Sequence, residues 1–332
     1  NQQSLRGLFG RERGIDQPHL YLMQPFDPRR RIIVMVHGLA SSPEAWVNVA
    51  NELLADEELR CEFQVWQVYY PTNMPVPASH AAIRQVLAAA LHHFDPEEET
   101  LASHGLVLIG HSMGGLLARL MVSTADQQLW EWAASDPRID LNRLGSTRSQ
   151  LDPLLRFQPF PGVDRVIFVA APHRGTVVAG QGLGRWVAGL IRLPLTLLST
   201  LGDAFPARAE TTAHDTILQN IPNSIDQLDE NDPFVKATSE LPISDQVSYH
   251  SIIARRQANG PLAESDDGLV PYRSAHLDGA ESEKIIVSGH SVQETAASVV
   301  EIRRILRKDI SKHRLTAADS SSVRRGSCPP QR

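Results

Sequence analysis

Cysteine is scarce in this sequence: only Cys61 and Cys328 occur among its 332 residues. Two cysteines do not form a disulfide framework, so nothing in the sequence requires one. Cys328 falls in a polar C-terminal stretch, and we expect it to be unpaired, with a single bridge as the alternative. Long hydrophobic runs are missing too. No stretch of about 18 uninterrupted apolar residues is present, which predicts no transmembrane helix.

Positive charge is also in short supply. The chain carries 32 lysines and arginines against 38 aspartates and glutamates, a formal net charge of −6. Its basic residues form no stripe interleaved with aromatics, which argues against nucleic acid as a partner. No group of residues has metal-ligand spacing, so we expect no metal. Because the chain begins with Asn1, loss of a signal peptide or anchor stays open, and neither compartment nor oligomeric state follows from the sequence.

Short apolar runs recur along the chain and predict strands. They cover residues 20–26, 31–38, 62–71, 104–112, 163–172, 246–254 and 283–289. Helical patterns lie between them: one starts near Ser42, one spans residues 77–94, one follows Ser112 and the last follows Ser291. Strands that alternate with helices indicate an α/β fold with a mainly parallel sheet.

Two long segments interrupt this alternation, over about residues 123–162 and 177–245. Connections of such length are uncommon unless they carry structure or function of their own, such as a lid. We therefore expect a polar lead-in over residues 1–18 and one α/β domain over residues 19–312, with the two segments inserted as a lid or cap. Residues 313–332 are expected to form a disordered tail.

Residues 110–114, Gly-His-Ser-Met-Gly, fit the G-x-S-x-G pattern of a nucleophile elbow. They directly follow the apolar run "LVLI" and lead into the helical pattern "LLARLMV". In such an elbow the serine sits on a strained turn between strand and helix, where the chain packs so closely that only small residues fit at the flanking positions. Ser112 is therefore the predicted nucleophile.

A serine nucleophile also needs donors for the oxyanion that forms on the attacked carbonyl group. The first is expected to be the N–H of Met113, at the start of the following helix, where backbone amides are free and negative charge is favoured. The second should come from the loop after an earlier strand, "VHGLASSPEAW". In that loop the Leu39 N–H is the first candidate and the Ala40 N–H is the second.

The serine further needs a base, and the base needs a carboxylate that orients it. His290 follows the last predicted strand and precedes a helix, which suits the base. Asp267 lies after a late strand, and we favour it as the partner of His290, with the adjacent Asp266 as the alternative. The chain order serine, aspartate, histidine is the one expected for an elbow of this kind. His276 is a weaker competitor for the base, and His173 is expected to shape a turn or the pocket.

These motifs resemble those of the α/β-hydrolase superfamily, and within it those of bacterial lipases and carboxylesterases. The resemblance extends from about Arg31 to Leu306 and covers the two insertions least. It is carried by "VHGLASSPEAW", "GHSMGG", "AAPHRGT", "SDDGLVPYRSAHLDG" and "SGHS". It implies a catalytic triad of Ser112, Asp267 and His290, and hydrolysis of carboxylic esters without a cofactor. The usual acid motif of the family has one aspartate before the glycine, and the doublet here departs from it.

The second insertion contains apolar residues at helical spacing, namely Leu183, Trp186, Val187, Leu190 and Ile191. A cap over the serine would place this face, with Trp186, Leu190 and Ile191, along the acyl chain of a substrate. The alternatives are a helix packed on the core and an anchor on a membrane surface. The cap predicts a hydrophobic acyl ester as substrate, such as a lipid or a polyester, and transient contact with a lipid interface.

The sequence therefore predicts a serine carboxylesterase or lipase. An acyltransferase that uses the same triad is the first alternative, because it differs only in what intercepts the acyl-enzyme. A non-catalytic binding protein on a hydrolase fold is the second alternative, and the presence of all the expected parts argues against it. The sequence does not determine the physiological substrate or the preferred acyl chain length.

Overall fold

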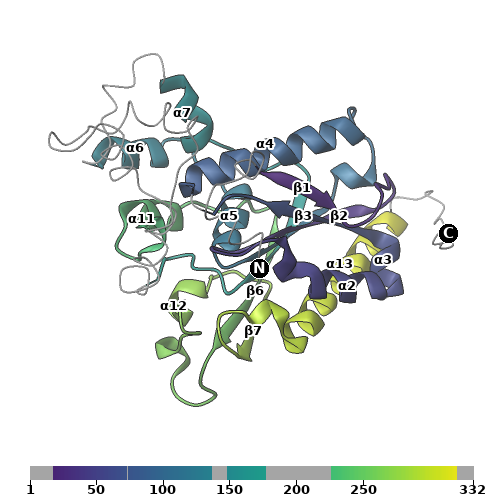
Figure 1. Cartoon of the computed structure of the whole chain (residues 1–332). Coiled ribbons are helices and arrows are strands. Elements are labelled where there is room, and N and C mark those ends of the chain that lie inside the picture. Colours follow the sequence, from purple (N-terminus) through teal and green to yellow (C-terminus); the bar gives the residue numbers. More distant parts are fainter. Residues whose placement is uncertain (1–17, 73, 137–147, 177–225, 320–332) are drawn as a thin grey trace.

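The computed structural model describes residues 18–72, 74–136, 148–176 and 226–319, arranged as Figure 1 shows. In these residues seven strands form one sheet in the order β1-β3-β2-β4-β5-β6-β7. β1 pairs antiparallel with β3, and every other neighbouring pair is parallel. The strands are β1 (His19–Leu22), β2 (Arg31–Val36), β3 (Phe63–Tyr69), β4 (Leu106–His111), β5 (Val163–Val169), β6 (Ser248–Arg255) and β7 (Ser282–Val287). The predicted α/β fold with a mainly parallel sheet is confirmed.

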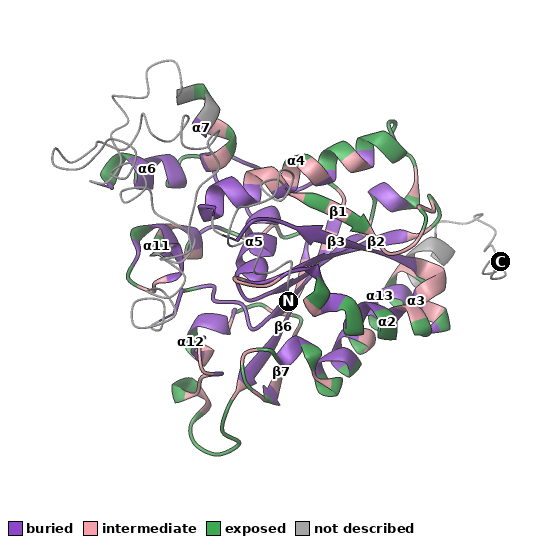
Figure 2. Cartoon of the chain, viewed as in Figure 1, coloured by how far each residue is buried: buried purple, intermediate pink, exposed green. Residues whose placement is uncertain are grey.

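Helices cover both faces of this sheet (Figure 1). Ile32 and Val34 of β2 belong to one hydrophobic cluster, whereas Ile33 and Met35 belong to another on the opposite face. The first cluster contains residues of α4 (Val76–Phe94) and α5 (Met113–Met121). The second contains residues of α2 (Val47–Ala55), α3 (Glu57–Glu62) and α13 (Ala296–Asp319). Because the central strands are buried on both faces (Figure 2), their sequences are continuously apolar instead of alternating.

Two predicted boundaries differ from the structure. β1 ends at Leu22 and not at Phe26, since Pro25 has no N–H to donate to a neighbouring strand. The Phe26 ring packs on the Phe94 ring instead, with centroids 4.5 Å apart. At the other end of the chain, α13 continues to Asp319, past residue 312, where the sequence predicts the end of the domain.

The described parts of the two insertions are mainly helical. α6 (Gln128–Ser135) and α7 (Arg148–Leu155) belong to the first insertion, and α11 (Pro233–Ser239) belongs to the second. The Trp132 and Phe234 rings meet edge to face with centroids 5.1 Å apart, so α6 and α11 pack together. Trp186, Leu190 and Ile191, predicted to line an acyl pocket, lie outside the described residues, and the cap remains a prediction.

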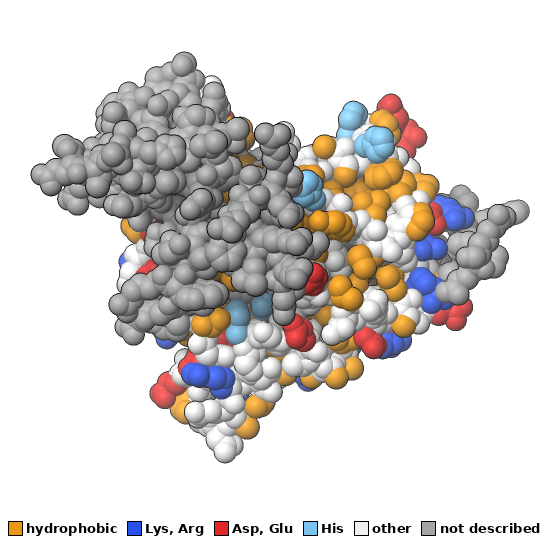
Figure 3. Space-filling model, viewed as in Figure 1, with side chains coloured by type: hydrophobic (Ala, Val, Ile, Leu, Met, Phe, Trp, Pro, Cys, Tyr) orange, Lys and Arg blue, Asp and Glu red, His pale blue; other side chains and the backbone are white. Residues whose placement is uncertain are grey.

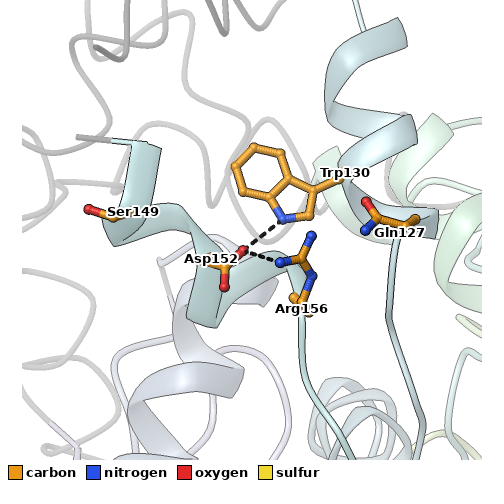
Figure 4. Close-up of a pocket in the computed structure, with 5 residues that line it drawn as sticks. All are labelled: Gln127, Trp130, Ser149, Asp152 and Arg156. Carbon is orange, nitrogen blue, oxygen red and sulfur yellow. Dashed lines mark hydrogen bonds and ion pairs between the residues drawn. The ribbon is translucent and has the colours of Figure 1, made fainter. Parts of the chain in front are cut away.

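A pocket of about 440 Å³ lies between α6 and α7 (Figure 4). Part of its lining is a small polar cluster in which Trp130 Nε1 donates to Asp152 Oδ1 at 3.2 Å. Arg156 forms an ion pair with the same carboxylate at 3.1 Å, and Gln127 and Ser149 complete the lining. None of the residues predicted from the sequence to act in catalysis lines this pocket.

Cys61, in α3, is disulfide-bonded, which favours the bridge over the unpaired cysteine expected from the sequence. The other cysteine of the chain, Cys328, lies outside the described residues. Among the described helices, none combines the length and the apolar character that crossing a membrane would need.

Candidate active site

Ser112 occupies a sharp turn between β4 and α5. Its backbone has φ 54° and ψ −127°, a positive φ that residues with a side chain rarely adopt. Hydrogen bonds hold the turn in place: Ser112 N–H donates to Val169 O at 2.9 Å, and Ser112 O accepts from Gly115 N–H at 2.8 Å. The strained conformation is therefore fixed by the strand and the helix on either side, and it sets the serine at the carboxyl edge of the sheet.

The glycines around this turn are required by packing. A Cβ on Gly110 would lie 2.3 Å from Gly114 O, and a Cβ on Gly114 would lie 2.3 Å from Val36 O. A Cβ on Gly115 would lie 2.4 Å from Ala171 Cβ. All three distances are far inside van der Waals contact, so only glycine allows β4, α5 and the neighbouring strands to approach this closely.

Three residues predicted from the sequence meet at this turn, although they lie far apart in the chain. His290 Nε2 is 2.8 Å from Ser112 Oγ, and His290 Nδ1 is 2.8 Å from Asp267 Oδ2. The serine follows β4, the aspartate follows β6 and the histidine follows β7. Because these strands are parallel members of one sheet, their carboxyl ends reach the same edge. This arrangement can pass the serine proton to the imidazole while the carboxylate orients the ring.

The structure distinguishes the two adjacent aspartates. The Asp267 side chain is 1% exposed, and its Oδ1 accepts from Leu269 N–H at 2.9 Å and from Val270 N–H at 2.8 Å. The Asp266 side chain is 42% exposed and forms an ion pair with Arg256 at 2.7 Å. The buried aspartate is therefore the one that contacts the histidine, and the exposed one is engaged on the surface.

Two backbone amides near the serine are available as donors. The Met113 N–H is the first amide of α5. Neither it nor the Leu39 N–H has a hydrogen-bond acceptor among the described residues. The Ala40 N–H, in contrast, donates to Thr72 Oγ1 at 3.3 Å. Of the two amides considered in this loop, only that of Leu39 has no acceptor in the described part of the chain.

His37 holds the peptide group that carries the Leu39 amide, and Tyr70 holds the peptide group before it. His37 Nδ1 donates to Gly38 O at 3.0 Å, and Tyr70 Oη donates to His37 O at 2.7 Å. The two rings stack with centroids 4.5 Å apart. The Gly38 carbonyl and the Leu39 N–H belong to one trans peptide group, in which they point in opposite directions. Because the carbonyl is held by His37, the direction of the Leu39 N–H is fixed as well.

Burial keeps two histidines beside the serine neutral. It lowers the pKa of His37 from 6.5 to about 4, and it is the main cause that lowers the pKa of His111 to about 3. In the unfolded chain both rings titrate near 6.5. As the pH falls below 6.5, the unfolded state therefore takes up protons that the folded state does not, and the stability present above pH 6.5 is progressively lost toward pH 4.

We expect the urea midpoint of unfolding to be lower at about pH 5 than at about pH 7.5 for this reason. His276 acts in the opposite direction, because its hydrogen bond to Glu283 raises its pKa and stabilises its charged form as the pH falls. The variant His276→Gln removes this opposing contribution, so its midpoint should fall more steeply than that of the wild type. A midpoint that stays constant or rises between the two pH values would contradict the expectation.

The other candidate histidines, His173 and His276, contact groups outside the triad. The buried ring of His173 meets the Phe168 ring edge to face, with centroids 4.6 Å apart, and burial lowers its pKa. His276 Nδ1 is 2.5 Å from Glu283 Oε2. Within the described residues, no group of three or more histidine, cysteine or acidic side chains is arranged to hold a metal ion.

Several residues around the site were not predicted from the sequence. Tyr70 and Thr72, in the loop after β3, hydrogen-bond to the loop that carries Leu39 and Ala40, and nothing in their local sequence indicates this. His111 Nε2 lies 2.9 Å from His290 O. A signal for it existed, because the triplet Gly-His-Ser occurs both at residues 110–112 and at residues 289–291.

The sequence matches the model of a known protein family. The sequence model of the alpha/beta hydrolase family matches residues 33–302, more than half of the chain. The chain belongs to the alpha/beta hydrolase family. No curated protein matches its sequence.

Solved structures similar to this alpha/beta hydrolase include bacterial lipases and esterases. The lipase of Staphylococcus hyicus has a TM-score of 0.52 at 15% identity, covering 90% of this chain and 100% of that one. The mature lipase BlEst2 of Bacillus licheniformis has a TM-score of 0.47 at 16% identity, with 87% and 97% covered. Esterase B of Lactobacillus rhamnosis, inhibited by a tributyrin phosphonate, has a TM-score of 0.47 at 12% identity, with 96% and 95% covered. At its identity, the likeness to the Staphylococcus hyicus lipase shows a shared fold.

Proposed function

We propose that this alpha/beta hydrolase cleaves hydrophobic carboxylic esters through an acyl-enzyme on Ser112. His290 acts as the general base and Asp267 as the acid that orients it. The observation that supports this proposal most is the hydrogen-bonded chain from Asp267 through His290 to Ser112, with 2.8 Å at both links. A serine hydroxyl is a weak nucleophile by itself, and such a chain is the usual means of activating it.

In the first half-reaction, His290 Nε2 takes the Ser112 proton while Oγ bonds to the ester carbonyl carbon. Asp267 stabilises the imidazolium that forms, because its Oδ2 already accepts the hydrogen bond from Nδ1. The tetrahedral intermediate then collapses. The bond to the leaving oxygen breaks, His290 gives its proton to that oxygen, and the alcohol departs with the acyl group left on the serine.

The developing negative charge on the carbonyl oxygen needs donors that are already in place. We assign this role to the backbone N–H groups of Met113 and Leu39. The first lies at the N-terminus of α5, where the helix dipole favours an anion. The second is directed by the bond from His37 to the Gly38 carbonyl. Both amides lack an acceptor among the described residues, so neither has to break a bond before it binds the oxyanion.

Water completes the cycle in the second half-reaction. His290 takes a proton from water as the water oxygen attacks the acyl-enzyme, and it then returns this proton to Ser112 Oγ as the acid leaves. One ester and one water become one carboxylic acid and one alcohol. The preference for a hydrophobic acyl group is proposed from the apolar pattern over residues 183–191, which would line the acyl chain if it forms the cap.

The proposal is tested by labelling with a fluorophosphonate ester, which reacts with activated serines, and by reading the intact mass. We expect one adduct on the wild type and none on Ser112→Ala. The matched control is Ser291→Ala, which removes the serine of the second Gly-His-Ser triplet and should label like the wild type. A series of p-nitrophenyl esters then tests the substrate class, and kcat/KM should rise with acyl chain length.

An adduct that persists in Ser112→Ala would show that another residue reacts, and it would refute the assignment of the nucleophile. Folded wild type that neither forms an adduct nor hydrolyses any ester, with or without detergent, would refute the proposed activity. Hydrolysis restricted to the shortest acyl chains would retain the mechanism and refute the hydrophobic substrate.

A further inference from the structure

The ring of His111 lies among the three loops that carry the candidate site. His111 is the last residue of β4, directly before Ser112. A Cβ on Gly38 would lie 3.2 Å from His111 Nδ1, so the ring also packs against the loop after β2 that carries Gly38 and Leu39, which we call the oxyanion loop. On its other side, His111 Nε2 donates to His290 O at 2.9 Å, and the two imidazole rings lie with centroids 5.0 Å apart. One buried side chain thus contacts the elbow, the oxyanion loop and the loop of the base.

The main chain around His290 has little other support. The nearest backbone hydrogen bonds among the described residues are from Ser288 N–H to Arg255 O at 2.9 Å and from Glu294 N–H to Ser291 O at 3.3 Å. Between them, the bond from His111 is the one hydrogen bond made by the described main chain of residues 289–290. Residue 289 is a glycine, which adds conformational freedom next to the base. The His111 bond therefore determines where this part of the loop sits.

We propose that His111 is a positioning residue, which holds the His290 imidazole within reach of both Ser112 and Asp267 by binding the His290 carbonyl. This inference rests on the function proposed above. The His290 ring forms two hydrogen bonds at once, each 2.8 Å long: Nδ1 with Asp267 Oδ2 and Nε2 with Ser112 Oγ. A displacement of the ring by about 1 Å would lengthen one of them beyond the range of a hydrogen bond. His111 acts on the base and has no role toward substrate.

The chemistry of the His111 ring suits a fixed donor. Because a carbonyl oxygen only accepts, the ring proton lies on Nε2, and Nδ1 carries none. His111 Nδ1 is buried and has no partner among the described residues, so a second proton would be an unpaired buried donor. Burial and the neighbouring His290 accordingly lower the pKa of His111 to about 3. The ring stays neutral near neutral pH and does not compete with His290 for the Ser112 proton.

The test compares two replacements of His111 in the full chain. His111→Phe keeps a ring of similar shape and removes the donor, whereas His111→Gln keeps an N–H donor at a similar reach. Each is treated with the fluorophosphonate, and the rate constant of labelling and the final labelled fraction are measured separately. kcat and KM are measured on one p-nitrophenyl ester.

For His111→Phe we expect the labelling rate constant and kcat to fall by about 10–100-fold. KM and the final labelled fraction should stay close to those of the wild type. His111→Gln should recover most of the rate. A structural role alone would reduce the labelled fraction and leave the rate constant of the remaining folded protein unchanged, and that result would overturn the proposal.

Two further results would also overturn it: an unchanged rate constant in His111→Phe, or an equal loss in both variants. Failure of the proposed function is distinguishable from these. If the wild type itself is not labelled at Ser112, the catalytic role of Ser112 fails and this inference fails with it. If the wild type is labelled and His111→Phe matches it, only the inference about His111 fails.

Discussion

Replacing Ser112 or His290 by alanine is expected to lower kcat by about 10⁴–10⁶-fold, and replacing both should lower it no further than either alone. Once the hydroxyl is absent there is no proton for His290 to take, and without the base the hydroxyl does not attack. The two side chains thus act as one unit linked at 2.8 Å. The measurement is the steady-state rate on a p-nitrophenyl ester for both single variants and the double variant, each shown to be folded by its unfolding transition.

The rate of hydrolysis that remains in these variants tests the contribution of the oxyanion donors. The amides of Met113 and Leu39 remain in place when the serine is removed, so hydrolysis above the rate in buffer should persist. Ser291→Ala is the matched control, since it removes an exposed serine next to the same histidine, and its kcat should stay within a few-fold of the wild type. If the fold-losses in kcat of the two single variants multiply in the double variant, Ser112 and His290 act independently, which contradicts the proposed mechanism.

Most of the fold could be predicted from the sequence because the central strands of the sheet are buried on both faces. Burial on both faces makes each of these strands a short continuous apolar run, and this pattern can be recognised without knowing which strands pair. β1 illustrates the limit: its apolar pattern extends to Phe26, but the strand stops at Leu22. Pro25 has no N–H to donate to a neighbouring strand, so the strand ends although the apolar residues continue. The sequence likewise predicts too early an end for the domain, at residue 312, whereas α13 continues to Asp319. The last residues of this helix are mostly polar, and in composition they resemble a disordered tail.

The candidate site was predictable to the extent that its residues carry local motifs. Ser112 has glycines on both sides, and the structure accounts for each of them by a specific close approach. The supports of the site could not be found this way. Thr72 engages the Ala40 amide and Tyr70 holds the His37 carbonyl, in both cases across about 30 residues of chain. Such contacts depend on how β2 and β3 lie side by side in the sheet, and local sequence does not record that.

The aspartate doublet is a case in which the sequence leaves two candidates and the structure favours one. Asp267→Asn is expected to lower kcat by about 10³–10⁴-fold, whereas Asp266→Asn should stay within a few-fold of the wild type. In Asp267→Asn the remaining oxygen can still accept from the Leu269 and Val270 amides, so the loop should keep its structure. The new NH₂ group then faces His290 Nδ1.

An NH₂ group only donates, so it forces His290 Nδ1 to accept and moves the ring proton to Nε2. Nε2 then points a proton at Ser112 Oγ and no longer takes one from it. Asp266→Asn breaks only the exposed ion pair with Arg256, and such pairs contribute at most about 1 kcal/mol to stability. Comparing kcat and the fluorophosphonate labelling rate of the two variants decides between the aspartates. If Asp266→Asn were the slow variant and Asp267→Asn the fast one, the orienting acid would be Asp266, and the loop after β6 would have to rearrange in the working enzyme.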